Sequence, residues 1–437
     1  MSLYYVTASE LSSVTEAINE KTNNSEALTY PQDYIDAFKH LEDQTKSIIY
    51  SYLTNHSIID SYYSDILYLR TYMFGRHDNS TLTELSLPNC LEVCGPILSP
   101  NQVNHSFIST INMPMCQKIG SHAFEKFLRL SHISFPNVAY IDDYAFASCS
   151  YLMNISFPEA INIGNRAFLS CTSLRSVYFP KVSNIDSHAF EGCTSLFSMD
   201  FSAATSIGEN AFYDCADLTA AKFPSVIAIG SRAFYRCTRL ITASFPSATV
   251  IGGSAFLGCV SLTTTSFPQV SEIGNQAFSN CSALRSAHFE AAISIGNAAF
   301  AYCYSLSSLS FSSAAYIGSA AFFQCSSLSR IYFPLATYIG SSAFNGCSSL
   351  EMASFPKLTD MDDQAFANCR LLMSLYLMGS TVVQLHGGNI LNNTPMKASS
   401  YTGTYGSIYV PASLLDIYKT SQDYGWYNFR SRFVGVE

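Results

Sequence analysis

A period of 22 residues constrains this chain more than any other feature of its sequence. Eleven cysteines form one arithmetic series with that step, from Cys149 and Cys171 to Cys369. The clearest copy of the repeat, LRSVYFPKVSNIDSHAFEGCTS, runs from Leu174 to Ser195, and the series continues without an insertion. A fixed period of this length predicts a solenoid, in which each repeat is one turn that stacks on its neighbours.

Apolar residues recur at fixed positions of the repeat and predict what each turn contributes. An Ala-Phe pair occurs twelve times, ending at Ala365 and Phe366, and a leucine column runs twelve times from Leu130 to Leu372. Columns of this kind should stack like on like. The unit L-x-x-(I/V/A)-x-F matches a short strand whose alternate residues point inward. We therefore expect one short strand per turn, paired in parallel with the next strand about 4.8 Å away.

The residues after each strand suit a change of direction. Proline follows the phenylalanine in most repeats, as at Pro136 and Pro158. Its missing N–H is tolerated there because the strand has ended. Further along, one position holds nine glycines and three aspartates, Asp142, Asp186 and Asp362. We interpret it as a tight turn that requires a positive φ or a bend capped by a side chain, with a structural role for the aspartates.

The chain contains fourteen cysteines, of which eleven share one position of the repeat. Neighbouring turns would bring their Cα atoms within bridging distance, yet eleven cysteines in one column cannot all pair. We expect this cysteine ladder, Cys149 to Cys369 in steps of 22, to be a column of buried, reduced thiols in a small apolar slot. Cys90 and Cys94 lack a second pair or a nearby histidine at zinc spacing, so we assign them to the core.

Composition and motifs exclude several classes of function. The net charge is −9 and only 13% of residues are charged, so no basic stripe is available for nucleic acid. No run approaches the roughly 18 apolar residues of a membrane span, and residues 1–20 do not match a secretory signal. No nucleophile, zinc, phosphate-loop or dinucleotide motif is present. We predict a protein that is not an enzyme, with no cofactor, no metal site and no membrane insertion.

Both ends of the chain differ from the repeats. Thr7 with Glu10 forms a capping-box pattern and Pro31 opens a second helical pattern, so residues 1–45 predict a helical hairpin. Residues 46–80 are rich in Ile, Leu and Tyr, and we expect them to cap the first open edge of a solenoid over residues 81–378. Residues 379–437 predict a C-terminal cap in which Trp426, the single tryptophan, covers the last core layer.

The whole repeat, L-x-x-(I/V/A)-x-FP-x-(V/A)-x-x-IG-x-x-AF-x-x-C, resembles that of BspA-like leucine-rich-repeat proteins. The segment IYVP…LLDIYK…W, from Ile408 to Trp426, is similar to their closing segment. The resemblance implies a curved or gently twisted leucine-rich-repeat solenoid, displayed at the bacterial cell surface or secreted, with adhesion to host proteins or other cells as its role. The first forty residues separately resemble the start of prophage tail or fibre proteins of Gram-positive bacteria.

Two hypotheses of function follow. In the first, a non-enzymatic binding or adhesion protein holds a protein or glycan on the outward residues of its sheet. Because tyrosine and arginine are favoured as interface anchors, the candidate ligand-binding residues are Tyr178, Arg330, Tyr332 and Tyr376, and the alternative is a solvated face without a ligand. In the second, the chain is a structural or receptor-binding component of a prophage tail-like particle, attached through residues 1–41.

Overall fold

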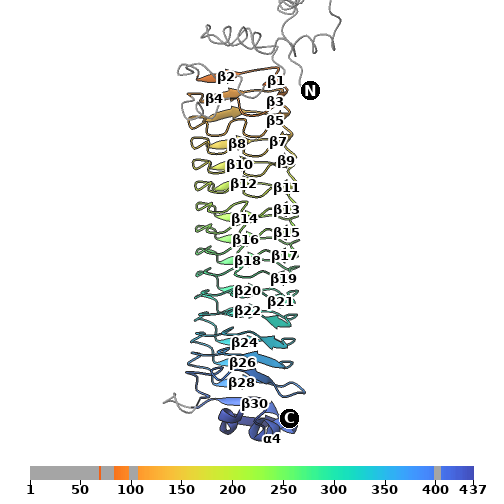
Figure 1. Cartoon of the computed structure of the whole chain (residues 1–437), viewed down its shortest axis with the longest axis vertical. Coiled ribbons are helices and arrows are strands. Elements are labelled where there is room, and N and C mark those ends of the chain that lie inside the picture. The colour runs from red at the N-terminus through yellow and green to blue at the C-terminus, as the bar shows by residue number, and fades with distance from the viewer. Residues whose placement is uncertain (1–67, 70–82, 98–106, 398–404) are drawn as a thin grey trace, which may run out of the picture. The chain divides into compact units, whose positions relative to one another are not determined.

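The structure is a computed structural model that describes residues 68–69, 83–97, 107–397 and 405–437 (Figure 1). The chain divides into two compact units, Met1–Val182 (unit 1) and Ser183–Glu437 (unit 2). The hairpin expected at residues 1–45 and most of the cap expected at 46–80 lie outside the described residues. Within each unit, parallel strands stack turn upon turn, so the solenoid predicted from the period is confirmed.

Unit 1 contains two kinds of strand. Those at the middle of the L-x-x-(I/V/A)-x-F motif span three residues: β2 (Glu84–Ser86), β4 (Thr110–Asn112), β6 (His132–Ser134), β8 (Asn154–Ser156) and β10 (Ser176–Tyr178). Those of the other series span two residues, and from β5 onward they carry the isoleucine that precedes the glycine position: β1 (Tyr68–Leu69), β3 (Glu92–Val93), β5 (Lys118–Ile119), β7 (Tyr140–Ile141) and β9 (Asn162–Ile163). The two-residue strands pair in chain order, and the three-residue strands pair as β2-β4-β6 and β8-β10. The strands pair in a register that places equivalent residues of successive repeats opposite each other, as with Ile141 and Ile163.

Unit 2 continues the same two kinds of strand through more turns (Figure 1). The three-residue strands of the motif are β12 (Ser198–Asp200), β14 (Ala220–Lys222), β16 (Thr242–Ser244), β18 (Thr264–Ser266), β20 (Ser286–His288), β22 (Ser308–Ser310), β24 (Arg330–Tyr332), β26 (Met352–Ser354) and β28 (Ser374–Tyr376). The strands of the other series are β11 (Asn184–Ile185), β13 (Ser206–Ile207), β15 (Ala228–Ile229), β17 (Val250–Ile251), β19 (Glu272–Ile273), β21 (Ser294–Ile295), β23 (Tyr316–Ile317), β25 (Tyr338–Ile339), β27 (Asp360–Asp362) and β29 (Gln384–His386). This second series pairs in unbroken order from β11 to β29.

The second strand of each turn goes beyond the single strand expected from the sequence. In β19, Ile273 is 3% exposed whereas its neighbour Glu272 faces outward. One inward isoleucine and one outward residue are enough for a ladder step, because the next turn repeats both in register. The fold class is as predicted, but each turn contributes to two ladders of strands instead of one.

Two phenylalanine columns fill the interior of the turns in unit 2. Phe256 of one Ala-Phe pair stacks on Phe278 of the next, with ring centroids 5.2 Å apart and planes 3° from parallel. Phe245 of the strand motif stacks on Phe267 at 5.4 Å, and Phe256 meets Phe267 edge to face at 5.7 Å. Stacked and edge-to-face pairs at such distances stabilise a core beyond the area that they bury. The expectation that like residues stack on like is confirmed.

The glycine column has a different cause from the one predicted. The backbone of Gly274 does not have a positive φ, but a Cβ atom there would lie 2.6 Å from the amide nitrogen of Gly253 in the preceding turn. Positive φ angles occur two and six residues later, 58° at Gln276 and 59° at Asn280. The N–H of Gln276 thereby donates to the carbonyl of Asn297 in the next turn, at 2.8 Å. The expected positive φ at the glycine position is therefore wrong, and close approach of neighbouring turns selects glycine there.

Two of the three aspartates of the same column, Asp142 and Asp362, bind side chains of a neighbouring turn. Lys118 Nζ lies 3.3 Å from Asp142, whose charge raises the pKa of that lysine. The hydroxyl of Tyr338 donates to Asp362. These contacts agree with the structural role predicted for the aspartates.

The cysteine ladder lies in the core as free thiols, as expected. Sγ of Cys303 donates to the carbonyl oxygen of Phe278, 25 residues earlier, at 3.2 Å. The same oxygen accepts the N–H of Cys281 at 3.2 Å. The thiol is thus a polar link between turns as well as a small apolar filler. Burial raises the pKa values of Cys303 and Cys347 to about 12.

The cysteines of unit 1 outside the ladder differ in burial. Cys90 is buried, as predicted, and its Sγ donates to the carbonyl of Glu92 at 3.5 Å. Cys94 is partly exposed, so its assignment to the core is only partly correct.

Unit 2 ends in a cap built around Trp426. The cap comprises β30 (Ser407–Pro411), η2 (Ala412–Leu414), α4 (Leu415–Thr420), η3 (Tyr427–Arg432) and β31 (Phe433–Val436). The indole is fully buried, and its Nε1–H donates to the carbonyl of Val383 at 2.7 Å. The N–H of Val383 in turn donates to the hydroxyl of Tyr418 at 3.0 Å. Trp426 is therefore a buried core residue at this end of unit 2.

Candidate binding face

The four predicted ligand-binding residues point outward from three-residue strands, but they do not share one sheet. Tyr178 is the last residue of β10 in unit 1 and is 44% exposed. Arg330 and Tyr332 are the first and last residues of β24, and Tyr376 is the last residue of β28, all in unit 2. The structure thus brings three of the four candidates onto one sheet, which has the order β24-β26-β28-β30-β31.

Strand register turns the outward residues of this sheet into rows. One row consists of Tyr332, Ser354, Tyr376, Tyr409 and Val434. The other consists of Arg330, Met352, Ser374 and Ser407. Neighbouring members of a row are about 4.8 Å apart at the backbone. The first row therefore places three tyrosines within three strand spacings.

Tyr409 belongs to this surface although the sequence analysis did not select it. Its ring stacks on Tyr376, with centroids 4.4 Å apart and planes 10° from parallel. Tyr409 follows Tyr376 by 33 residues (409 minus 376) instead of 22, so the period does not reveal their adjacency. The alternation of Ile408 and Val410 inward with Tyr409 outward is the sequence signal that could have identified it.

The chemistry of this surface suits contact with another macromolecule. We call Arg330, Tyr332, Tyr376 and Tyr409 the tyrosine face. Tyr332 is 59% exposed, and within the part of the chain that the structure describes, the guanidinium of Arg330 has no ion-pair partner. Exposed tyrosine rings offer apolar area with a polar tip, and a guanidinium offers five donors. The face can therefore supply both apolar contact and directed hydrogen bonds.

Residues 83–97, 107–397 and 405–437 do not bring together the groups of a metal site. No cluster of three or more His, Cys, Asp or Glu side chains there could hold a metal ion. Histidines of this region instead form hydrogen bonds with single carboxylates, such as His122 with Glu125 at 2.6 Å and His386 with Asp360 at 2.9 Å. The helices of this region include none that is long and apolar enough to cross a membrane.

Solved structures similar to this chain include several bacterial leucine-rich-repeat proteins. One from Bacteroides ovatus is 21% identical, covers 69% of this chain and 88% of its own, and has a TM-score of 0.46. A leucine-rich cell-surface protein from Faecalibacterium prausnitzii is 22% identical with the same coverage and a TM-score of 0.40. The leucine-rich-repeat protein of T. pallidum is 26% identical over 40% of this chain and 78% of its own, with a TM-score of 0.33.

Comparison with protein families gives a more extensive match. No curated protein matches the chain. A model described as a BspA type leucine-rich-repeat region matches residues 69–197, 161–285, 205–317 and 249–373. These segments overlap into one continuous span from residue 69 to residue 373, which includes nearly every turn described above. Because that span covers more than half of its length, the chain belongs to the family of proteins with BspA-type leucine-rich repeats.

Proposed function

We propose that this chain is a non-enzymatic binding or adhesion protein that holds a protein partner on its tyrosine face. BspA-like leucine-rich-repeat proteins are generally protein-binding or adhesion proteins, and the repeat is a binding scaffold without catalytic chemistry. The observation that carries the proposal is the grouping of Arg330, Tyr332, Tyr376 and Tyr409 on one five-stranded sheet.

The energetics of interfaces favour this surface over the serine-rich and threonine-rich strands of unit 2. Tyrosine and arginine are enriched among residues whose truncation costs about 2 kcal/mol or more of binding free energy. Stacking of Tyr376 on Tyr409 restrains both rings before binding, so less side-chain entropy is lost when a partner docks. Serine and threonine lack comparable contact area, and they are under-represented among such anchors.

The size of the face indicates how far the partner must extend. Five strands span about 20 Å at the spacing of a sheet. A stable interface covers about 800 Å² on each partner, which is more than five strands of three to five residues can present. We therefore expect the partner to contact flanking turns or cap residues as well, with the tyrosine face as its central anchor.

Paired substitutions test this placement. Purified protein would be screened on arrays of host matrix proteins and glycans, and the affinity for each hit measured by surface plasmon resonance. Arg330→Ala with Tyr332→Ala should weaken binding by at least about thirtyfold, the equivalent of 2 kcal/mol. Thr264→Ala with Ser266→Ala, at the same repeat positions on β18, is the matched control and should leave affinity within about twofold.

Both double variants should keep the wild-type melting temperature, because all four side chains point outward from their strands. Unchanged affinity of the Arg330 and Tyr332 double variant would contradict the proposed face. Hits confined to glycans would instead change the class of partner.

A cell-surface or secreted location is part of the proposal, because BspA-like proteins are typically found at cell surfaces. An antibody raised to the solenoid would follow the native protein through washed cell surface, cytosol and sedimentable particles of the source cells. Signal on intact cells is the expected result. Signal confined to the cytosol would contradict this location, and signal that sediments with particles would support the tail-component hypothesis instead.

A further inference from the structure

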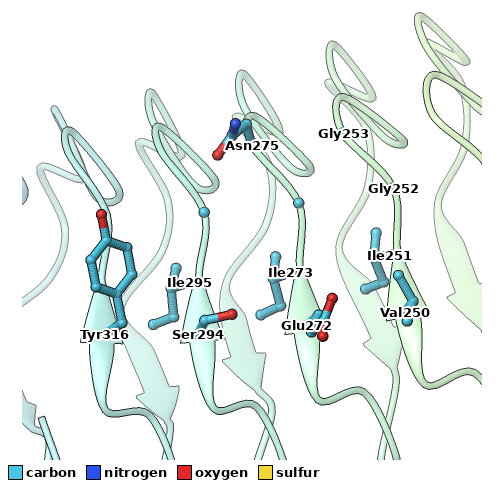
Figure 2. A pocket seen from close by; sticks show the side chains of 12 residues that line it. Val250, Ile251, Gly252, Gly253, Glu272, Ile273, Asn275, Ser294, Ile295 and Tyr316 are labelled. Atoms are coloured by element: carbon cyan, nitrogen blue, oxygen red, sulfur yellow. The ribbon is translucent and has the colours of Figure 1, made fainter.

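Unit 2 has a second surface feature, on the strands that the tyrosine face does not use. A groove of about 350 Å³ lies along β17, β19, β21 and β23. Figure 2 shows the outward residues of these four strands, Val250, Glu272, Ser294 and Tyr316, in a row along it. The groove lies within unit 2 and is separate in sequence and in sheet from Arg330, Tyr332 and their neighbours.

The backbone of the glycine column forms part of the surface of this groove. Gly252, Gly274 and Gly296 line it on successive turns, and they leave a strip without side chains. Their amides already bond between turns, as where the N–H of Gly274 donates to the carbonyl of Ile251 at 2.9 Å. Recognition in the groove therefore depends on the side chains along its length.

Tyr316 presents one ring face to the groove. The opposite face is covered by Tyr338 of β25, with ring centroids 5.0 Å apart and planes 7° from parallel. Tyr338 is held by its hydrogen bond to Asp362, so the pair of rings is fixed. On the groove side the next strand carries Ser294, which is too short to cover a ring, and Tyr316 remains 43% exposed.

Glu272 lies on the other side of Ser294. Its carboxylate is exposed and has no ion-pair partner in the described part of the chain, and no lysine or arginine lines the groove. Three acidic residues elsewhere in unit 2 do have arginine partners on the next turn. These pairs are Glu209 with Arg232, Asp214 with Arg236, and Asp217 with Arg239. Glu272 is thus an uncompensated negative charge beside an open aromatic face.

We propose that the position above Ser294 binds an arginine side chain of a protein partner. Ser294 is one strand spacing from Glu272 and one from Tyr316, so those two residues are about 9.6 Å apart at the backbone. A cation acts on a ring within about 6 Å of its centre and pairs with a carboxylate within about 4 Å. One guanidinium above Ser294 therefore satisfies both contacts.

Arginine fits this position better than lysine does. Its planar guanidinium stacks on an aromatic face while its N–H groups donate to a carboxylate in the same plane. A contact between an arginine and a tyrosine ring already occurs between neighbouring turns of unit 1. There the guanidinium carbon of Arg166 lies 5.6 Å from the ring centre of Tyr144. Beside Tyr316 the neighbouring turn supplies only Ser294, so the guanidinium must come from a partner.

Two arginine substitutions in one column provide the test. Ser294→Arg would place a guanidinium of the chain itself between Glu272 and Tyr316 and block the groove. Ala228→Arg on β15 adds the same side chain at the same repeat position, but its strand neighbours are Ser206 and Val250. A random dodecapeptide phage library would be selected on the wild-type protein and counter-selected on Ser294→Arg, and enriched peptides synthesised.

The enriched peptides should contain arginine and should bind wild type and Ala228→Arg alike. Replacing that arginine with citrulline, which keeps the shape without the charge, should weaken binding about tenfold, from loss of an ion pair and a cation–π contact. Peptides that lack arginine, or that bind Ser294→Arg as well as wild type, would overturn the proposal. So would a selection that yields no binding peptide, or a lysine version that binds equally well.

Glu272→Gln keeps the proposal testable if Ser294→Arg does not fold. Because Glu272 is exposed, this substitution should not disturb the fold, and it should weaken binding of the arginine peptide about threefold. Glu351→Gln removes the same charge from an exposed position outside the groove and should leave the affinity unchanged. Equal affinities of the two glutamine variants would overturn the assignment of Glu272.

Discussion

Alkaline pH should unfold unit 2 through its buried thiols. In this unit, burial raises the pKa of eight ladder cysteines, Cys215 to Cys369 in steps of 22, above the ordinary value of 9.0. Only the neutral thiol fits the core, whereas the unfolded chain ionises near pH 9. A raised folded pKa contributes stability that is complete below the unfolded pKa. That stability is lost as the pH rises toward the folded value, about 12 for Cys303.

The magnitude follows from the unfolded state. At pH 10, each thiol lowers the free energy of unfolding by about 1.4 kcal/mol relative to neutral pH, because one pH unit corresponds to about 1.36 kcal/mol per proton. Eight such thiols together remove about 11 kcal/mol. A typical domain has about 5–15 kcal/mol of stability in total. We therefore expect unit 2 to lose much of its stability by pH 10 and to unfold at a pH below the folded pKa of Cys303.

A single substitution isolates this effect. Cys281→Ala and wild type would be unfolded in guanidinium at pH 8 and pH 10 and followed by circular dichroism. At pH 8 the variant should be less stable, because it loses packing and the bond from Sγ to the carbonyl of Phe256 at 3.2 Å. At pH 10 only wild type has this thiol to ionise, so the difference should shrink by about 1.4 kcal/mol.

The control for this experiment is Leu284→Ala. Leu284 is buried, lies three residues from Cys281 and has no ionisable group. It should show the same difference from wild type at both pH values. An unchanged difference for Cys281→Ala between pH 8 and pH 10 would refute the linkage of thiol ionisation to unfolding.

Three further predictions concern the core and the cap. A thiol reagent should label few cysteines in the native protein and most of the fourteen after unfolding, as counted by mass spectrometry, and extensive native labelling would contradict their burial. Gly274→Ala should lower the free energy of unfolding by about 1–3 kcal/mol, because its Cβ would lie 2.6 Å from Gly253. In Gly253→Ala the nearest atom to the new Cβ is 3.5 Å away, so the free energy of unfolding should change by less than about 0.5 kcal/mol. Equal guanidinium midpoints for the two variants would exclude close approach as the cause. Tyr418→Phe should lower the free energy of unfolding by about 1–3 kcal/mol in the same assay, because the N–H of Val383 loses its acceptor. A variant as stable as wild type would show that this hydrogen bond contributes nothing.

Much of the fold could be predicted because a strict period places like residues beside like, whatever the local geometry. The stacked phenylalanines, the buried thiols and the parallel ladder of three-residue strands all follow from it. The second ladder could not be predicted, since a strand of two residues such as Glu272–Ile273 is too short to leave an alternating pattern. The cause of the glycine column depends on the distance between turns, which residue types alone do not reveal.

The candidate face was predictable only in part, for a related reason. Tyr332 and Tyr376 keep the period, so their shared row on the sheet follows from their numbers. Tyr409 is out of step with it, because the cap inserts extra residues before β30. Nothing in the repeat marks the division after Val182 that places Tyr178 in the other unit.

Because the register is the same between paired strands of successive repeats in unit 2, the backbone of one such turn could pair with that of any other. If recombination removed one whole repeat, the strands on either side of the deletion could still pair with each other. The charges are less tolerant, because three acidic residues on the turn of Glu209 face three arginines on the turn of Arg232. Those two turns are matched to each other by charge, so loss of either one would leave the acidic or the basic residues of the other without these partners.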